Sequence, residues 1–135
     1  MILGIGLDLC EIHRIEKAIA RAHFLERVFT PAERARILSA TGPRRGEIAA
    51  GLFAAKEAVA KALGTGFDGF GPDAVEILPD AHGRPACTLH RKALELAGGG
   101  HILISITHEN GMAAATAILE SGIENARPCH SADKF

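Results

Sequence analysis

The stretch from Leu52 to Gly66 constrains the fold more than any other part of this chain. It is rich in alanine, leucine, lysine and glutamate, which all favour the α-helix, and glycine is common where helices end. The sequence therefore predicts a helix that finishes at or near Gly64. One side of this helix is an apolar stripe that consists of Leu52, Ala55, Val59 and Leu63.

Glu57 and Lys61 share another face of the predicted helix, because they stand four residues apart. In an arbitrary helix, this spacing gives an exposed ion pair worth about 0.2–0.5 kcal/mol. A role in chemistry therefore has to be supported by residues elsewhere in the chain.

A strand is predicted over residues 1–9, where side chains alternate between two faces. Glycine inside a strand often marks the close approach of another backbone or of a ligand. We expect a helix to pack on the glycine-bearing face and to bring its side chains close to Asp8. Capping of the next helix is the alternative role of this carboxylate. The apolar face holds Leu3, Ile5, Leu7 and Leu9, and the other face holds Ile2, Gly4, Gly6 and Asp8.

Apolar residues recur with helical spacing over residues 12–19 and predict a helix with one face toward the core. Arg14, Lys17 and Arg21 lie on another face of the same predicted helix. A solvated surface is the commoner explanation of such charges, but an acidic partner would also fit them.

The rest of the chain alternates between helix and strand patterns. Residues 30–33 form the capping-box sequence that begins a helix, and residues 41–46 are typical of a turn before the long helix. Further patterns predict strands over 74–78 and 86–88, a helix over about 89–97, and strands over 102–108 and 112–119.

The last two predicted strands are joined around Asn110 and Gly111, a strong signal for a hairpin. His108 therefore lies at a strand end beside a tight turn, where ligands often bind, although a lone histidine there is usually a surface residue. The expected fold class is α+β, with a small antiparallel sheet packed against a long central helix.

The length of 135 residues, 47% of them hydrophobic, suits one domain, which we expect to span residues 1–120. The polar segment 121–135 is predicted to be a flexible tail. Apolar runs never approach the roughly 20 residues that cross a bilayer, so we expect a cytoplasmic protein without membrane contact. The spacing of the cysteines supports neither a disulfide framework nor a zinc site. These are Cys10, Cys87 and Cys129.

Charge is unevenly distributed along the chain. Residues 11–45 hold eight basic residues against four acidic ones, and the remainder holds seven against twelve. A basic segment suits nucleic acid, a phosphorylated ligand or an acidic protein. Basic and aromatic residues do not interleave here, so no nucleic-acid partner is expected.

Three segments together carry a resemblance to a known family. They are Gly-Ile-Gly-Leu-Asp-Leu-Cys-Glu-Ile near the N-terminus, Phe-Ala-Ala-Lys-Glu-Ala-Val-Ala-Lys-Ala-Leu-Gly-Thr-Gly in the centre, and Ser-Ile-Thr-His-Glu toward the C-terminus. In this order and spacing, residues 1–120 closely resemble the holo-acyl-carrier-protein synthase family of 4'-phosphopantetheinyl transferases.

The resemblance implies transfer of the phosphopantetheine arm of coenzyme A to a serine of an apo acyl carrier protein, with release of adenosine 3',5'-bisphosphate. Asp8 and Glu57 match the two carboxylates that hold Mg²⁺ in the family, and Lys61 matches a residue that offsets charge on the phosphate oxygens. The serine proton is taken either by Glu57 or by a metal-bound water.

The resemblance also implies ligand contacts. His108 matches a contact to the nucleotide phosphates of coenzyme A, with Ser105 and Thr107 as further candidates. The turn of Gly64, Thr65 and Gly66 matches a segment beside the pantetheine arm.

Family members dock their acidic carrier proteins against the first helix, so the resemblance makes Arg14, Lys17 and Arg21 candidate docking residues. The family precedent is a homotrimer with active sites between subunits. In a shared site, Asp8 and Glu57 could come from one chain and His108 from its neighbour, and the sequence leaves open which chain supplies which residue.

Two positions depart from the family pattern. Leu52 stands where an arginine commonly contacts the coenzyme A phosphates, and Arg44 or Arg45 is our candidate for replacing that charge. Cys10 stands where larger relatives have a further acid, and we expect it to be buried because a thiol is a poor magnesium ligand.

Two rival functions are a noncatalytic module that binds coenzyme A or a carrier protein, and a small metal-dependent phosphohydrolase. The loss of arginine at position 52 favours the first rival, whereas the retention of Asp8, Glu57 and Lys61 favours catalysis. The second rival leaves the basic helix surface without a purpose.

Overall fold

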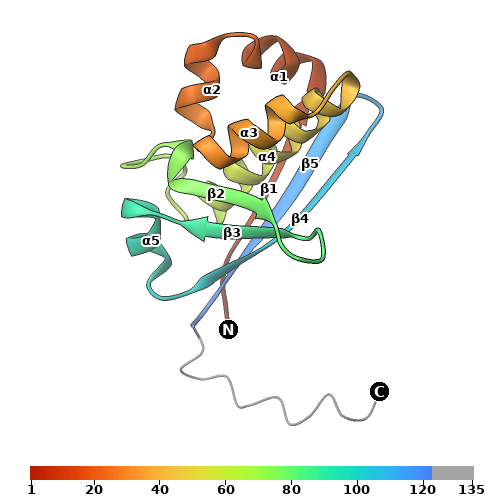
Figure 1. Cartoon of the computed structure of the whole chain (residues 1–135). Coiled ribbons are helices and arrows are strands. Elements are labelled where there is room, and N and C mark those ends of the chain that lie inside the picture. Colours follow the sequence, from red (N-terminus) through yellow and green to blue (C-terminus); the bar gives the residue numbers. More distant parts are fainter. Residues whose placement is uncertain (123–135) are drawn as a thin grey trace.

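The computed structural model describes residues 1–122, so most of the predicted tail, from residue 123 onward, lies outside the described residues (Figure 1). The helices are α1 (Ile12–Ile19), α2 (Ala22–Val28), α3 (Pro31–Ser39), α4 (Pro43–Ala62), the short 3-10 helix η1 (Pro72–Ala74) and α5 (Arg91–Ala97). The strands are β1 (Ile2–Glu11), β2 (Val75–Pro79), β3 (Pro85–Leu89), β4 (His101–Glu109) and β5 (Met112–Glu120).

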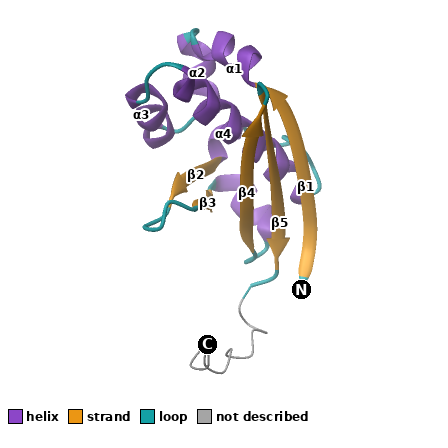
Figure 2. Cartoon of the chain, turned by 90° about the vertical axis from the view of Figure 1, so that its right-hand side faces the viewer, coloured by secondary structure: helices purple, strands orange, loops and turns teal. Residues whose placement is uncertain are grey.

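The long helix α4 packs on one face of an antiparallel sheet with the order β1-β5-β4 (Figure 2). The predicted fold class is therefore confirmed. Strands β2 and β3 pair with each other in a separate two-stranded sheet. Helices α1 to α3 gather at one end of α4 (Figure 1). No helix within residues 1–122 is both long and apolar enough to traverse a lipid bilayer.

Glycine lets β1 and α4 approach each other at backbone distance. A Cβ atom added at Gly6 would lie only 1.8 Å from the carbonyl oxygen of Ala58, and one at Gly4 would lie 2.0 Å from that of Ala62. No side chain fits in these spaces. The expectation that a helix packs on the glycine face of this strand is confirmed.

The leucine and isoleucine side chains of β1 consequently face away from α4. Ile5, Leu7 and Leu9 are 68%, 66% and 63% exposed. No element of the described chain covers this outer face of the sheet (Figure 2). Contiguous apolar surface of this kind is uncommon on a monomeric protein.

A buried ion pair joins α3, α4 and the start of β2. Lys56 Nζ lies 2.7 Å from Glu33 Oε1, and both side chains are inaccessible to solvent. Lys56 also donates to the carbonyl oxygens of Pro72 and Val75. The predicted capping box is confirmed, since Glu33 accepts from the backbone N–H of Thr30, and the Thr30 hydroxyl accepts from the N–H of Glu33.

The prediction of one helix carrying Arg14, Lys17 and Arg21 is wrong. Helix α1 ends at Ile19, and Arg21 adopts an extended conformation before α2 begins. If α1 continued as a straight helix, its buried face would next contain the polar residues His23 and Glu26. The residues that are buried after α1 are instead Val28 and Phe29. The break lets both segments bury their own apolar faces.

Two predicted chain reversals are confirmed. Asn110 and Gly111 have φ angles of +51° and +76° in the β4–β5 hairpin, a conformation typical of Asn-Gly turns. Helix α4 ends at Ala62, and Gly64 follows with a φ of +87°.

Candidate active site

Asp8 and Lys61 meet where β1 crosses the C-terminal half of α4. Lys61 Nζ lies 3.2 Å from Asp8 Oδ1 and donates to the carbonyl oxygen of Leu7 at 2.8 Å. The Asp8 side chain is 18% exposed and that of Lys61 is 53% exposed. The contact depends on Gly4 and Gly6, which bring the strand close to the helix.

Glu57 lies one turn before Lys61 on the same face of α4. Burial raises the pKa of its carboxyl group, the negative charge of Asp8 raises it further, and the positive charges of Lys61 and Arg14 oppose the increase. Asp8 and Glu57 are thus two carboxylates held close enough to repel each other, beside two cations.

This carboxylate pair fits a hard divalent cation. Carboxylate oxygens are the ligands that magnesium prefers, and it often binds through only one or two of them, with substrate phosphates and water completing its shell. Within residues 1–122, no group of three or more His, Cys, Asp or Glu side chains is arranged to hold a metal ion. The donor set therefore suits magnesium with a phosphate substrate and does not suit a closed structural metal site.

Cys10 does not join the carboxylates, as expected. It is 5% exposed, and its thiol donates to the carbonyl oxygen of Ala50 at 3.3 Å. Burial, followed by the charge of Asp8, raises the pKa of this thiol to about 11. Cys10 is therefore a neutral packing residue.

An apolar groove of about 560 Å³ begins beside Glu57. Its aromatic walls consist of Phe24, Phe53, Phe67 and Phe70, and Arg27 lies at its edge. The ring centroids of Phe24 and Phe53 are 6.1 Å apart. The groove offers an apolar surface next to the carboxylate pair.

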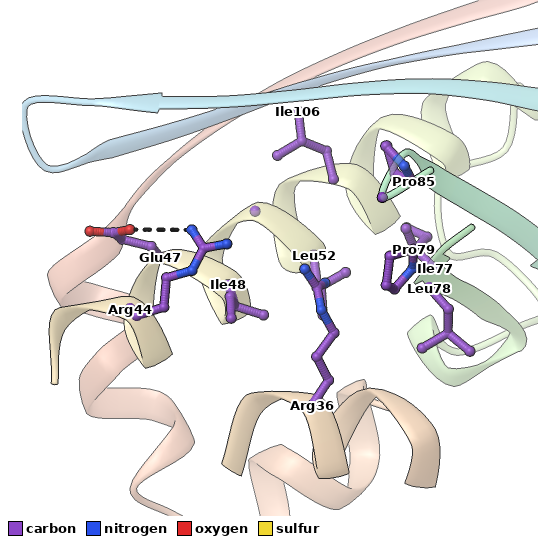
Figure 3. Close-up of a pocket in the computed structure, with 12 residues that line it drawn as sticks. Arg36, Arg44, Glu47, Ile48, Leu52, Ile77, Leu78, Pro79, Pro85 and Ile106 are labelled. Carbon is purple, nitrogen blue, oxygen red and sulfur yellow. Dashed lines mark ion pairs between the residues drawn. The ribbon is translucent and has the colours of Figure 1, made fainter. Parts of the chain in front are cut away.

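His108 and Arg44 come together through Glu47, a residue that the sequence analysis missed. Glu47 Oε2 lies 3.7 Å from Arg44 Nη1 and 3.6 Å from His108 Nε2. The spacing of Arg44 and Glu47 by three residues is a helix-pair signal, but nothing in the sequence indicated that the end of β4 lies beside them. Arg44 and Glu47 line a second cavity together with Leu52 and Ile106 (Figure 3).

The two groups of candidate residues lie at different positions along α4. Lys61 contacts Asp8 of β1, whereas His108 contacts Glu47, which precedes Glu57 by ten residues. At a rise of 1.5 Å per residue, ten residues span about 15 Å of helix. His108 is therefore not beside the carboxylates of its own chain.

Residues 4–116 match the family model of the 4'-phosphopantetheinyl transferase superfamily. This chain belongs to that superfamily.

Relatives within the 4'-phosphopantetheinyl transferase superfamily match the chain over most of its length. A holo-[acyl-carrier-protein] synthase of Solidesulfovibrio magneticus is 50% identical, with 89% of this chain and 99% of that protein covered. The holo-[acyl-carrier-protein] synthase of Clostridium beijerinckii is 45% identical, with 90% and 99% covered.

Solved structures of 4'-phosphopantetheinyl transferases share the fold. The Bacillus anthracis holo-(acyl-carrier-protein) synthase in complex with CoA (3',5'-ADP) has a TM-score of 0.79 and 36% identity, with 90% of this chain and 99% of that chain covered. The Helicobacter pylori enzyme in complex with coenzyme A has a TM-score of 0.76 and 30% identity, with 86% and 99% covered.

Ser105 and Thr107 lie on the opposite face of the β1-β5-β4 sheet from His108. In β4, Ile106 and His108 face the side of the sheet that carries α4, whereas Ser105 and Thr107 face outward. On this outer face, β5 separates them from Leu7 and Leu9. Any ligand contact of these two hydroxyls is therefore made on the uncovered side of the sheet.

The predicted basic docking residues of this transferase chain are all exposed. Arg14 and Lys17 project from α1, and Arg21 lies in the turn before α2. Arg14 is close enough to the carboxylate pair to lower the pKa of Glu57. The basic surface and the carboxylates thus adjoin each other.

The turn after α4 brings the last predicted contacts close to Lys61. Gly64 and Gly66 have positive φ angles, and the Thr65 hydroxyl donates to the carbonyl oxygen of Gly66 at 3.0 Å. Apart from the adjacent residues of the turn, no atom of residues 1–122 lies within 4 Å of a Cβ added at either glycine, so this turn has room for a ligand.

Proposed function

We propose that this protein transfers the 4'-phosphopantetheine group of coenzyme A to a serine of an apo acyl carrier protein. The products are a holo carrier protein and adenosine 3',5'-bisphosphate. The observation that carries this proposal is the Asp8–Glu57 carboxylate pair with Lys61 beside it. The names of the relatives at 45–50% identity support the same reaction.

We propose that Asp8 and Glu57 hold a magnesium ion. Magnesium bound there would neutralise the pyrophosphate of coenzyme A and polarise the phosphorus that is attacked. The fit of the carboxylate oxygens to a hard cation supports this assignment.

Lys61 positions Asp8 and contacts the substrate in this proposal. Its ammonium group has three protons, of which two are directed to Asp8 and to the carbonyl oxygen of Leu7. The third proton is available to a phosphate oxygen, where the positive charge stabilises developing negative charge.

Glu57 is the candidate base for the carrier's serine hydroxyl. A general base works best when its pKa is near the working pH, and burial together with Asp8 raises the pKa of Glu57 toward that range. The proton would pass from the serine Oγ to the Glu57 carboxylate as the oxygen attacks phosphorus.

The carrier protein would dock on the exposed basic residues Arg14, Lys17 and Arg21. The proximity of Arg14 to Glu57 supports a carrier bound there presenting its serine to the carboxylate pair. Such surface charges act mainly on the rate of encounter and on its salt dependence.

We further propose that the active protein is a homotrimer with shared sites. The uncovered apolar face of β1 supports association, and the position of His108 beside Glu47, ten residues before Glu57 in α4, supports a site completed by a second chain. His108 and Arg44 of one subunit would then contact the coenzyme A whose pyrophosphate lies at Asp8 and Glu57 of its neighbour. The outward Ser105 and Thr107 would lie at the same interface.

Mass spectrometry of an apo carrier protein tests the proposed reaction. After incubation with coenzyme A, magnesium and this protein, the carrier gains the mass of phosphopantetheine, and a chelator prevents the gain. Release of nucleotide without modification of several carriers would instead identify a phosphohydrolase. Binding of coenzyme A without either product would identify a noncatalytic module.

A further inference from the structure

A cavity of about 190 Å³ lies between α3, α4, β4 and the β2–β3 hairpin. Sites that enclose a whole small ligand usually measure about 300–1,000 Å³, so this cavity suits one end of a longer ligand. Arg36 from α3 and Arg44 from α4 both reach into it (Figure 3). The walls are mostly apolar and include Ile48, Leu52, Ile77, Pro79, Pro85 and Ile106.

Arg36 differs from its neighbouring arginines in having no protein partner within residues 1–122. Arg34 donates to the carbonyl oxygens of Phe29 and Glu26. Arg45 donates to the carbonyl oxygens of Leu38 and Ala40 at the end of α3 and is not among the residues that line the cavity. By contrast, the guanidinium of Arg36 forms neither an ion pair nor a side-chain hydrogen bond in the described part of the chain and extends over Leu52 (Figure 3).

The surroundings of Arg36 disfavour its positive charge in the absence of a ligand. Burial lowers the pKa of the guanidinium, the positive charge of Arg44 lowers it further, and Glu33 opposes the decrease. Glu33 is already paired with Lys56, and Glu47 lies between Arg44 and His108. Two guanidinium groups thus line the cavity. Arg44 shares the Glu47 carboxylate with His108, whereas Arg36 has no acidic partner among the described residues.

We propose that Arg36 and Arg44 together bind a phosphate group of the coenzyme A nucleotide. This inference rests on the proposed function and adds a binding residue to it. A guanidinium presents paired N–H donors that match phosphate oxygens, and a dianion relieves the repulsion between two arginines. Arg36 reaches the cavity from α3. It provides a positive charge next to Leu52, whose own side chain is uncharged.

The phosphate bound by Arg36 is either the 3'-phosphate or the pyrophosphate of coenzyme A. Calorimetric titration of the full-length protein with coenzyme A and with dephospho-coenzyme A separates the two. If Arg36→Gln weakens the binding of coenzyme A but not that of dephospho-coenzyme A, Arg36 binds the 3'-phosphate. If it weakens the binding of both ligands equally, Arg36 binds the pyrophosphate.

Arg36→Gln is expected to weaken coenzyme A binding by about 10- to 100-fold, because it removes charge-assisted hydrogen bonds. Arg36→Lys retains the charge and should recover part of the affinity. Lys92→Gln removes an exposed positive charge on α5 that is not among the residues lining the cavity, and should leave affinity within about twofold.

Unchanged coenzyme A affinity in Arg36→Gln, in a preparation with the wild-type melting temperature, would overturn the inference. The carrier-modification assay on the same wild-type preparation separates this failure from failure of the proposed function. The wild-type protein could modify no carrier while Arg36→Gln still weakens coenzyme A binding. That result would support the phosphate site and reject the transferase activity.

Discussion

The ammonium group of Lys56 and the carboxylate of Glu33 form a 2.7 Å ion pair that solvent does not reach. Every polar atom of the pair has protein partners: the second Glu33 oxygen accepts from the backbone N–H of Ile77 at 2.9 Å. Burial still lowers the pKa of Lys56, because the partner's charge does not fully offset the loss of hydration. The pair fixes α3, α4 and β2 relative to one another, and α4 carries Glu57 directly after Lys56.

Replacement of Lys56 by methionine should destabilise the protein strongly. It leaves the Glu33 carboxylate buried without a counter-charge, which typically costs about 3–5 kcal/mol. Urea denaturation measures this cost, and the same replacement at the exposed Lys92 should cost no more than about 1 kcal/mol. Equal losses in the free energy of unfolding for the two variants would mean that the buried ion pair makes no specific contribution to stability.

Gly6→Ala should separate β1 from α4. The added methyl carbon would lie 1.8 Å from the carbonyl oxygen of Ala58, and a helix backbone cannot move aside as a flexible side chain can. We expect a loss of at least about 1–3 kcal/mol in the free energy of unfolding. Turnover should fall further than stability explains, since the same displacement carries Asp8 away from Lys61. Wild-type turnover in the folded variant would contradict this link.

Local sequence patterns predicted most elements of this fold because their signals lie within a few residues. The run ending at Gly64, the capping box at Thr30 and the Asn110-Gly111 turn are such signals. Helix α2 was not predicted, and α4 begins at Pro43, inside the segment 41–46 that was interpreted as a turn. The break before Arg21 was missed because it depends on which apolar residues find a place in the core, and Ala20 is no helix breaker. The Glu33–Lys56 pair joins distant positions and leaves no local pattern.

The candidate site was predicted in part for the same reason. The alternation in β1 placed Asp8 on the glycine face, and helical spacing joined Glu57 to Lys61. The contacts of Glu47 with His108, and of Arg36 with the cavity above Leu52, depend on the packing of separate elements. No spacing rule indicates such contacts, so the sequence directed attention to Arg44 and Arg45 and not to Arg36.

The Glu57 carboxyl group should titrate above the usual range for glutamate in the metal-free protein. Asp8→Asn should lower its pKa by removing a negative charge, and Lys61→Met should raise it by removing a positive one. Carbon-13 NMR of the side-chain carboxyl measures both shifts. Metal binding needs the ionised carboxylate. As the pH is lowered, magnesium affinity should therefore begin to fall at a higher pH than it would with an ordinary glutamate. Identical titration in all three proteins would show that the charges do not interact.

The uncovered face of β1 should hold subunits together. Leu7→Asp places a charge at its centre and should reduce the molar mass in light scattering to that of one chain. Leu94→Asp makes the same change at an exposed leucine of α5 and should leave the assembly intact. A monomeric wild-type protein would reject the proposed trimer directly.

Mixed subunits test whether two chains build one site. Asp8→Ala and His108→Ala should each be inactive alone, because each damages every site in its own trimer. In a random mixed trimer, about a quarter of the interfaces combine an intact Asp8 with an intact His108, so coexpression should restore about a quarter of wild-type turnover. Mixing Asp8→Ala with Glu57→Gln is the matched control: both carboxylates of a site come from the same chain, so no interface regains a complete carboxylate pair. Restored turnover in the control, or none in the test, would show that the geometry of the site is not the one proposed.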